Sequence, residues 1–123
     1  MPGNLFLRTS VVFLVIGVAL GMFMGIKQDF VQAPTHAHLN LIGGVWMFLA
    51  GLFYNAHPHL SRKAVLIHYG LAVIAILTFV PGLYGVNASL PWGEKAVMVG
   101  ATLAAIQFVY FAVMVFIGTA RKA

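Results

Sequence analysis

Four apolar segments, each long enough to cross a bilayer as a helix, dominate the chain and limit what it can fold into. They cover approximately residues 7–26, 35–56, 62–85 and 94–118. A spanning helix needs roughly 20 mostly apolar residues, and each segment satisfies this requirement. We therefore predict an all-α integral membrane protein, a single four-helix transmembrane bundle over residues 1–123.

The breaks between these segments contain residues that end or begin helices. Lys27, Gln28 and Asp29 close the first segment, and Pro34 opens the second. A further turn precedes residue 62, where Ser61 is a suitable N-cap for the third helix. No small-residue cleavage site follows the first segment directly, and its apolar run exceeds the roughly 7–15 residues of a signal-peptide core, so we expect it to be a retained helix.

The composition excludes several classes of protein. Hydrophobic residues make up 62% of the chain and charged residues only 7%, whereas charged residues make up about 25% of soluble domains. There is no cysteine, which rules out disulfides, iron–sulfur clusters and thiolate zinc sites. The net charge is +5, but the basic residues are scattered at helix ends rather than gathered on one face, so no nucleic-acid partner is expected.

The basic residues instead predict the direction of the helices, because Lys and Arg favour cytoplasmic loops. Those expected at one side of the membrane are Arg8, Arg62, Lys63, Arg121 and Lys122. Lys27 and Lys95 are expected at the other side. We therefore predict a multi-pass protein of a bacterial inner (cytoplasmic) membrane with both termini in the cytoplasm.

Two histidines, His36 and His38, stand two residues apart near the outer end of the second segment. Ionisable side chains inside a membrane indicate a functional site, and neutral imidazole is a common ligand of metals and haem iron. At about 100° per residue the two imidazoles point about 200° apart, so they cannot chelate one metal from a regular helix. They can serve two sites on opposite sides of that helix.

Each histidine has a different helical face. The face of His36 also carries Asn40 and Gly43, and such small or polar neighbours leave room for a flat macrocycle. The face of His38 is apolar and is expected to meet lipid or a partner. We predict His36 and His38 as metal ligands, with Asn40 and Gly43 beside a bound cofactor.

Another histidine, His68, lies inside the third segment on a face of small residues. Counted from the cytoplasmic helix ends, it is level with Gln107, which predicts a hydrogen bond between the two side chains. It is also a candidate cofactor-binding residue. Its depth differs from that of His36 and His38 by about eleven residues, or ~16 Å, so one haem is not expected to join them.

The run HAHLNLIGGVWMFLAGLFYNAHP, followed by LIHYGLAVIAIL, resembles the tenth and eleventh helices of the catalytic subunit (subunit I) of haem-copper oxidases. The cbb-type oxidases and nitric oxide reductases are the most similar members. In that family the first histidine of the pair binds the high-spin haem and the second the low-spin haem, which implies these roles for His36 and His38. Nothing in the chain matches the ligands of the family's copper centre, so reduction of oxygen or nitric oxide by one chain is not expected.

The leading functional hypothesis is a haem b-binding membrane cytochrome that acts in electron transfer or gas sensing. The alternative is a copper-handling or oxidase-assembly accessory subunit, because Met22 and Met24 lie at the same end as His36 and His38, and thioether and imidazole suit copper. We expect a homo-oligomer, a dimer or trimer in membrane lipid, and a respiratory-chain partner. Gly17, Gly21 and Gly25 form a stripe that serves either packing inside the bundle or self-association.

Overall fold

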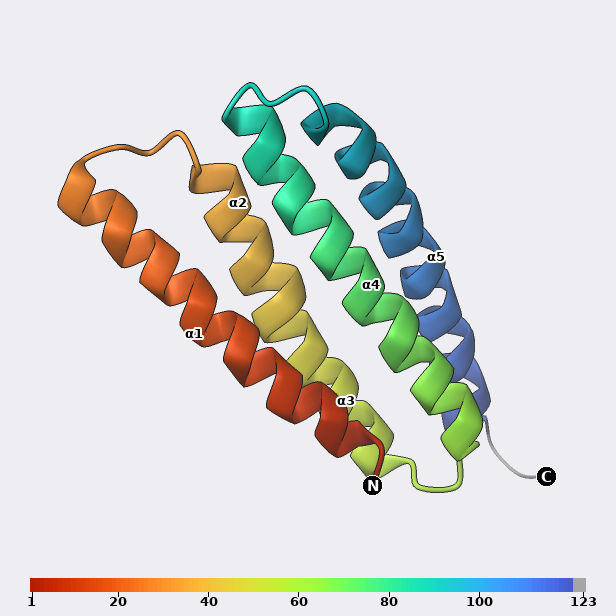
Figure 1. The fold of residues 1–123 in the computed structure, drawn as a ribbon. Helices are drawn as coiled ribbons and strands as arrows, with labels where there is room; N and C mark the ends of the chain where they lie inside the picture. Colours follow the sequence, from red (N-terminus) through yellow and green to blue (C-terminus); the bar gives the residue numbers. More distant parts are fainter. Residues whose placement is uncertain (121–123) are drawn as a thin grey trace.

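The computed structural model describes residues 1–120, and all of its regular elements are helical. In order, they are α1 (Gly3–Lys27), α2 (Ala33–His38), the π-helix η1 (Leu39–Trp46), α3 (Met47–Ala56), α4 (Arg62–Asn87) and α5 (Gly93–Thr119). α2, η1 and α3 follow one another without a break and form one continuous helix, the second rod. The four rods are α1, this second rod, α4 and α5, and they lie side by side as two antiparallel helical hairpins (Figure 1). Arg121 and Lys122, used above for orientation, lie outside the described residues.

All four rods are long and apolar enough to span a membrane. The predicted all-α, four-helix class is therefore confirmed, and each predicted segment agrees with its helix to within a few residues. Ser61 does cap α4, because its hydroxyl accepts a hydrogen bond from the Ala64 amide at 3.3 Å. The N-terminus lies at the same end of the bundle as the turn before α4 (Figure 1).

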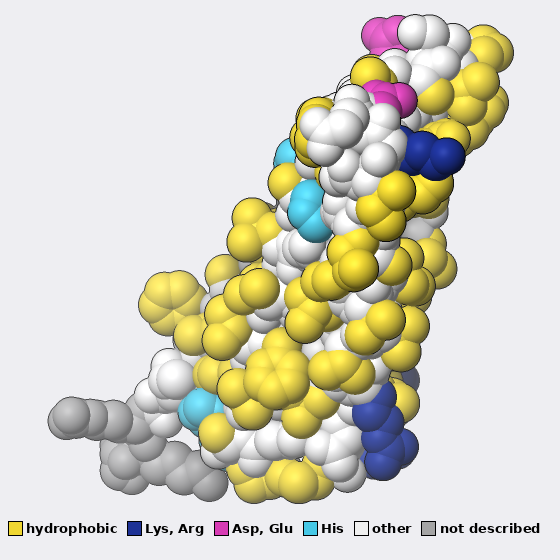
Figure 2. Space-filling view, turned by 90° about the vertical axis from the view of Figure 1, so that its left-hand side faces the viewer, with side chains coloured by type: hydrophobic (Ala, Val, Ile, Leu, Met, Phe, Trp, Pro, Cys, Tyr) yellow, Lys and Arg dark blue, Asp and Glu magenta, His cyan; other side chains and the backbone are white. Residues whose placement is uncertain are grey.

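The two ends of the molecule differ in charge. Both acidic residues of the chain, Asp29 and Glu94, accompany Lys27 and Lys95 at the end that holds the α1–α2 and α4–α5 connections. On the face shown in Figure 2, acidic side chains are visible only near this end. The opposite end carries basic residues without any acidic residue, so the asymmetry in the sequence is a net positive charge at one end of the bundle.

The first hairpin is held together by side chains of the second rod that fill space left by glycines of α1. The Nδ1–H of His36 donates to the Gly17 carbonyl at 2.7 Å, and a Cβ on Gly21 would come within 2.6 Å of the His36 ring. A Cβ on Gly17 would overlap Asn40. The glycine stripe therefore serves packing inside the bundle at these two positions, whereas a Cβ on Gly25 would meet no neighbour within 4 Å.

The π-helix η1 keeps one face of the second rod turned toward α1 over its whole length. His36 meets α1 at Gly17, and Asn55, five turns later, donates to Asn4 at 2.7 Å. Five turns at 3.6 residues per turn take about 18 residues, but the separation from His36 to Asn55 is one residue longer. The wider turns of η1 absorb that extra residue. Gly43 and Gly44 sit inside η1, where added Cβ atoms would come within 3.0 Å of Phe13 and Leu14.

The second hairpin, α4 and α5, also depends on close backbone approach. Gly100 packs directly on the backbone of Phe79, and a Cβ on Gly82 would lie 2.7 Å from the Val97 nitrogen. Small residues at such crossings allow van der Waals packing between helices where lipid provides no hydrophobic driving force. The two hairpins then meet around the buried side chain of His68.

Replacement of Gly17 by alanine tests the packing of α1 on the second rod. The new Cβ would overlap Asn40, so we expect Gly17→Ala to destabilise the protein by about 1–3 kcal/mol, the usual cost of overpacking. Gly25→Ala is the matched control, since it lies on the same stripe with nothing nearby. Thermal unfolding in detergent measures both, and equal melting temperatures for the two variants would contradict the packing assigned to Gly17.

Candidate functional site

The His36–His38 segment is fixed where the second rod begins. Pro34 occupies the first turn of α2, where a missing N–H has no helical partner to lose. Thr35 is buried, donates to Gln32 Oε1 at 2.7 Å and accepts from Asn87 Nδ2 of α4 at 3.3 Å. These bonds attach the start of α2 to the last turn of α4, so both histidines stand on an anchored helix start rather than on a loop.

His36 is held in one tautomer by its contact with α1. A carbonyl oxygen only accepts, so the 2.7 Å contact between Nδ1 and the Gly17 oxygen requires the proton on Nδ1. The lone pair of the neutral ring then lies on Nε2, which has no hydrogen-bond partner within the described chain. Metal-binding histidines are commonly oriented in this way, by donating the other ring nitrogen to a carbonyl.

His38 is oriented by the same chemistry on a different face of the helix. Its Nδ1–H donates to the Pro34 carbonyl at 2.7 Å, which also leaves the lone pair on Nε2. The ring packs edge-on against Phe79 of α4, with centroids 5.4 Å apart, and is partly buried. Val45 and Leu49, two and three turns after His38 on the apolar face expected for it, are exposed. His38 itself partly faces α4. The wider turns of η1 rotate the later residues around the helix axis relative to His38.

Asn40 and Gly43, the predicted neighbours of a cofactor, both face α1. The amide of Asn40 lies 3.5 Å from His36 Nδ1, and its buried Oδ1 has no hydrogen-bond partner. Gly43 is buried, and the side chain of Phe13 fills the space beside it. Within one chain, α1 therefore occupies the side on which the sequence indicated room for a macrocycle.

His68 lies at the junction of all four rods and is fully buried. Its Nε2–H donates to Gln107 Oε1 at 2.9 Å, which confirms the predicted pair, and the Tyr54 hydroxyl donates to its Nδ1 at 2.7 Å. Five aromatic rings have centroids within 6 Å of the imidazole: Phe6, Trp46, Tyr54, Tyr110 and Phe111. Both ring nitrogens are used by the protein, so His68 joins the two hairpins and keeps no lone pair for a metal.

The sequence analysis missed Tyr54 as the second partner of His68. On a regular helix, Tyr54 lies five turns after His36 and shares its face. The extra residue absorbed by η1 rotates Tyr54 by about 100°, toward α4, and Asn55 takes its place facing α1. Only the paired glycines of η1 mark this change in the sequence, and they fit a regular helix equally well.

The structure does not gather the histidines of one chain into a metal centre. Within residues 1–120, no group of three His, Cys, Asp or Glu side chains is placed to hold one ion. The two methionines considered as copper ligands lie on different faces of α1. Met24 is buried, whereas Met22 is exposed beside Val15 and Val18. His36 and His38 therefore each offer one imidazole, and further ligands have to come from elsewhere.

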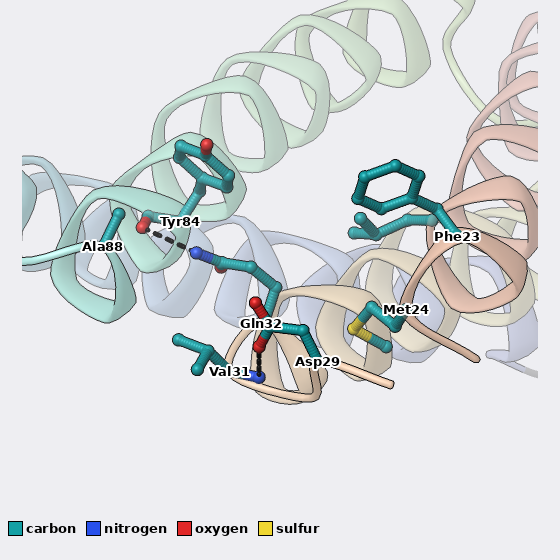
Figure 3. Close-up of a pocket in the computed structure, with 8 residues that line it drawn as sticks. Phe23, Met24, Asp29, Val31, Gln32, Tyr84 and Ala88 are labelled. Atoms are coloured by element: carbon teal, nitrogen blue, oxygen red, sulfur yellow. Dashed lines mark hydrogen bonds between the residues drawn. The ribbon is translucent and has the colours of Figure 1, made fainter. Parts of the chain in front are cut away.

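A groove of about 310 Å³ opens at the same end, between the end of α1, the α1–α2 connection and α4. Phe23 and Tyr84 stand on opposite sides of it, and Gln32 crosses it to donate to the Tyr84 carbonyl at 3.2 Å (Figure 3). Gln32 precedes His36 by one helical turn, so the groove lies next to the His36–His38 segment. Histidine side chains also reach the surface near this end (Figure 2).

Comparison with known proteins adds no relative: no protein-family model, curated protein or solved structure matches the chain.

Proposed function

We propose that the protein is a haem b-binding integral membrane cytochrome in which His36 and His38 ligate haem iron. The observation that carries the proposal is the pair of bonds from Nδ1 to the Gly17 and Pro34 carbonyls. They orient each ring and leave Nε2, the nitrogen that binds iron, with its lone pair free. The two imidazoles of this segment are therefore chemically suited to bind haem iron.

His36 is the principal ligand in this proposal, and His68 is a structural residue. His36 donates from Nδ1 to α1, and no hydrogen bond within the described residues competes for its Nε2. His68 is engaged at both nitrogens and enclosed by aromatic rings, so iron binding would require the central contact of the bundle to break. Asn40 and Gly43 act indirectly, because they fit the second rod to α1 and so fix the position of His36.

The proposed functional unit is a homo-oligomer, a dimer or trimer, with haem at or near the contacts between subunits. One chain supplies a single imidazole on each side of the second rod and no further level histidine. Val45, Leu49 and Leu52, further along the second rod, leave an apolar face exposed. A second copy would supply the further ligands that the described residues of one chain do not bring together.

Bound haem supplies reversible one-electron chemistry or, with an open axial position, binding of a small gas. The protein's contribution is to orient the imidazoles, His36 against the glycines of α1 and His38 against Phe79 of α4. We propose electron transfer or gas sensing, with a respiratory-chain partner for electron transfer. The resemblance to haem-copper oxidases supports the same assignment, on the His36–His38 pair and the glycine–aromatic run after it.

An absorption spectrum of the purified protein tests the proposal. We expect a Soret band and sharp α and β bands on reduction, and we expect His36→Ala to abolish or reshape them because the principal ligand is lost. His68→Gln is the matched control: it removes an imidazole from the same bundle but keeps a polar side chain, and should leave the haem spectrum intact.

Two outcomes contradict the haem assignment. A His68→Gln variant without haem, beside a His36→Ala variant with its full spectrum, would make His68 the ligand. A colourless wild-type protein that contains copper would favour the copper-handling alternative instead. Helical circular dichroism of each variant shows that the loss of the spectrum is not a loss of fold.

We also propose that both termini face the cytoplasm of a bacterial inner membrane. The support is the uncompensated positive charge of Arg8, Arg62 and Lys63 at one end, against two lysines and two acidic residues at the other. This orientation places His36 and His38 near the outer surface.

Cysteine accessibility tests the orientation cleanly because the chain has no native cysteine. Pro58→Cys and Ser89→Cys lie in exposed turns at opposite ends of the bundle. We expect a membrane-impermeant thiol reagent, added to intact cells, to label position 89 but not position 58. Labelling of position 58 alone would reverse the assigned orientation, and permeabilised cells serve as the control in which both are labelled.

A further inference from the structure

We propose that His57 and His59, in the turn between α3 and α4, form a second metal site that binds one imidazole-seeking transition-metal ion, with Cu²⁺ preferred. The site lies at the opposite end of the bundle from His36 and His38 and does not depend on haem. His57 directly follows α3, and Pro58 separates the two histidines in a non-helical turn. The restriction that prevents chelation by two such histidines on a regular helix does not apply there.

Both imidazoles are anchored so that each keeps one free lone pair. His57 stacks on Phe53, with centroids 4.2 Å apart, and its Nδ1–H donates to the Phe53 carbonyl at 2.7 Å. The Nε2–H of His59 donates to the Gly118 carbonyl at 3.1 Å. Carbonyls only accept, so the lone pairs lie on His57 Nε2 and His59 Nδ1. Metal-ligating histidines are usually oriented by a hydrogen bond of this kind from the other ring nitrogen.

The spacing of the rings fits one ion. Their centroids are 5.9 Å apart and their planes are inclined at 67°. Two nitrogens bound to one metal at about 2.0–2.1 Å lie roughly 3–4 Å apart, a separation that two ring edges at this spacing can adopt. A hollow of about 110 Å³ beside His57 is large enough to admit water molecules as further ligands.

The types of ligand atom around the turn determine which ions bind. Arg62 lines the same hollow, and no described acidic side chain lies at this end of the bundle. Hard cations such as Mg²⁺ and Ca²⁺ need carboxylate and carbonyl oxygens, so they are excluded. Imidazole ligands suit Cu, Ni and Zn, and among divalent ions Cu²⁺ forms the strongest complexes. Since His59 is bonded to Gly118 of α5, a bound ion would also connect the α3–α4 turn to the end of α5.

Titration with Cu²⁺ alone, on full-length protein purified without a polyhistidine tag, tests the site. We expect one equivalent to bind, with nitrogen coordination visible by electron paramagnetic resonance. Changes to residues behind metal ligands already cost about 10–100-fold in affinity, so His57→Phe, which can still stack on Phe53, and His59→Asn should each weaken binding at least about tenfold. His68→Gln is the matched control, because it removes an imidazole whose two nitrogens are already engaged inside the bundle, and it should bind Cu²⁺ like the wild type.

A melting temperature measured with and without Cu²⁺ gives a second readout, because an ion that binds only the folded turn stabilises it. We expect a rise in melting temperature for the wild type and His68→Gln but none for His57→Phe, while Mg²⁺ changes the melting temperature of none of them. The site is refuted if the two turn variants keep wild-type affinity, or if His38→Gln alone loses the bound ion. Because haem spectra and Cu²⁺ affinity are measured separately, failure of this site leaves the proposed haem function untouched.

Discussion

A polar side chain inside a membrane has to find its partner within the protein, and this constraint shapes the rod from Ala33 to Ala56. One face of that rod presents His36, Asn40 and Asn55 to α1, and another presents Tyr54 to His68 of α4. A uniform α-helix does not keep both faces aligned over five turns. The wider turns of η1 do, and the glycines of α1 and η1 provide the space in which the resulting contacts close.

The same constraint separates the histidines by role. His68 uses both nitrogens to hold the two hairpins together, so its chemistry is complete within the chain. His36 and His38 use only one nitrogen each, on a backbone carbonyl, and leave the other without a partner among the described residues, near one end of the bundle. Distortions of the π-helical kind are frequent at functional sites, and η1 begins directly after His38. An oriented imidazole with a free lone pair is the feature that distinguishes a candidate ligand from a packing residue here.

Much of the architecture follows from the sequence because it depends on length and polarity alone. The four spans, the cap at Ser61 and the His68–Gln107 bond all follow from hydropathy, capping chemistry and depth along the helices. The partners of Tyr54 and Asn55 do not, because a helical wheel assumes a constant rotation of about 100° per residue. One extra residue in η1 changes which side chain faces which helix. The anchoring of His36 by Gly17 also escapes the sequence, since it involves a backbone carbonyl rather than a side chain.

We propose that His36 and His38 ligate haem that is shared between copies of the chain. Native mass spectrometry of the wild-type protein in mild detergent reports the number of chains and of haems in one particle. If haem lies between copies, we expect a dimer or trimer that retains haem, and loss of haem when the particle dissociates to monomers. A monomer with full haem occupancy would show instead that one chain holds haem without a second copy, and the shared site would be wrong.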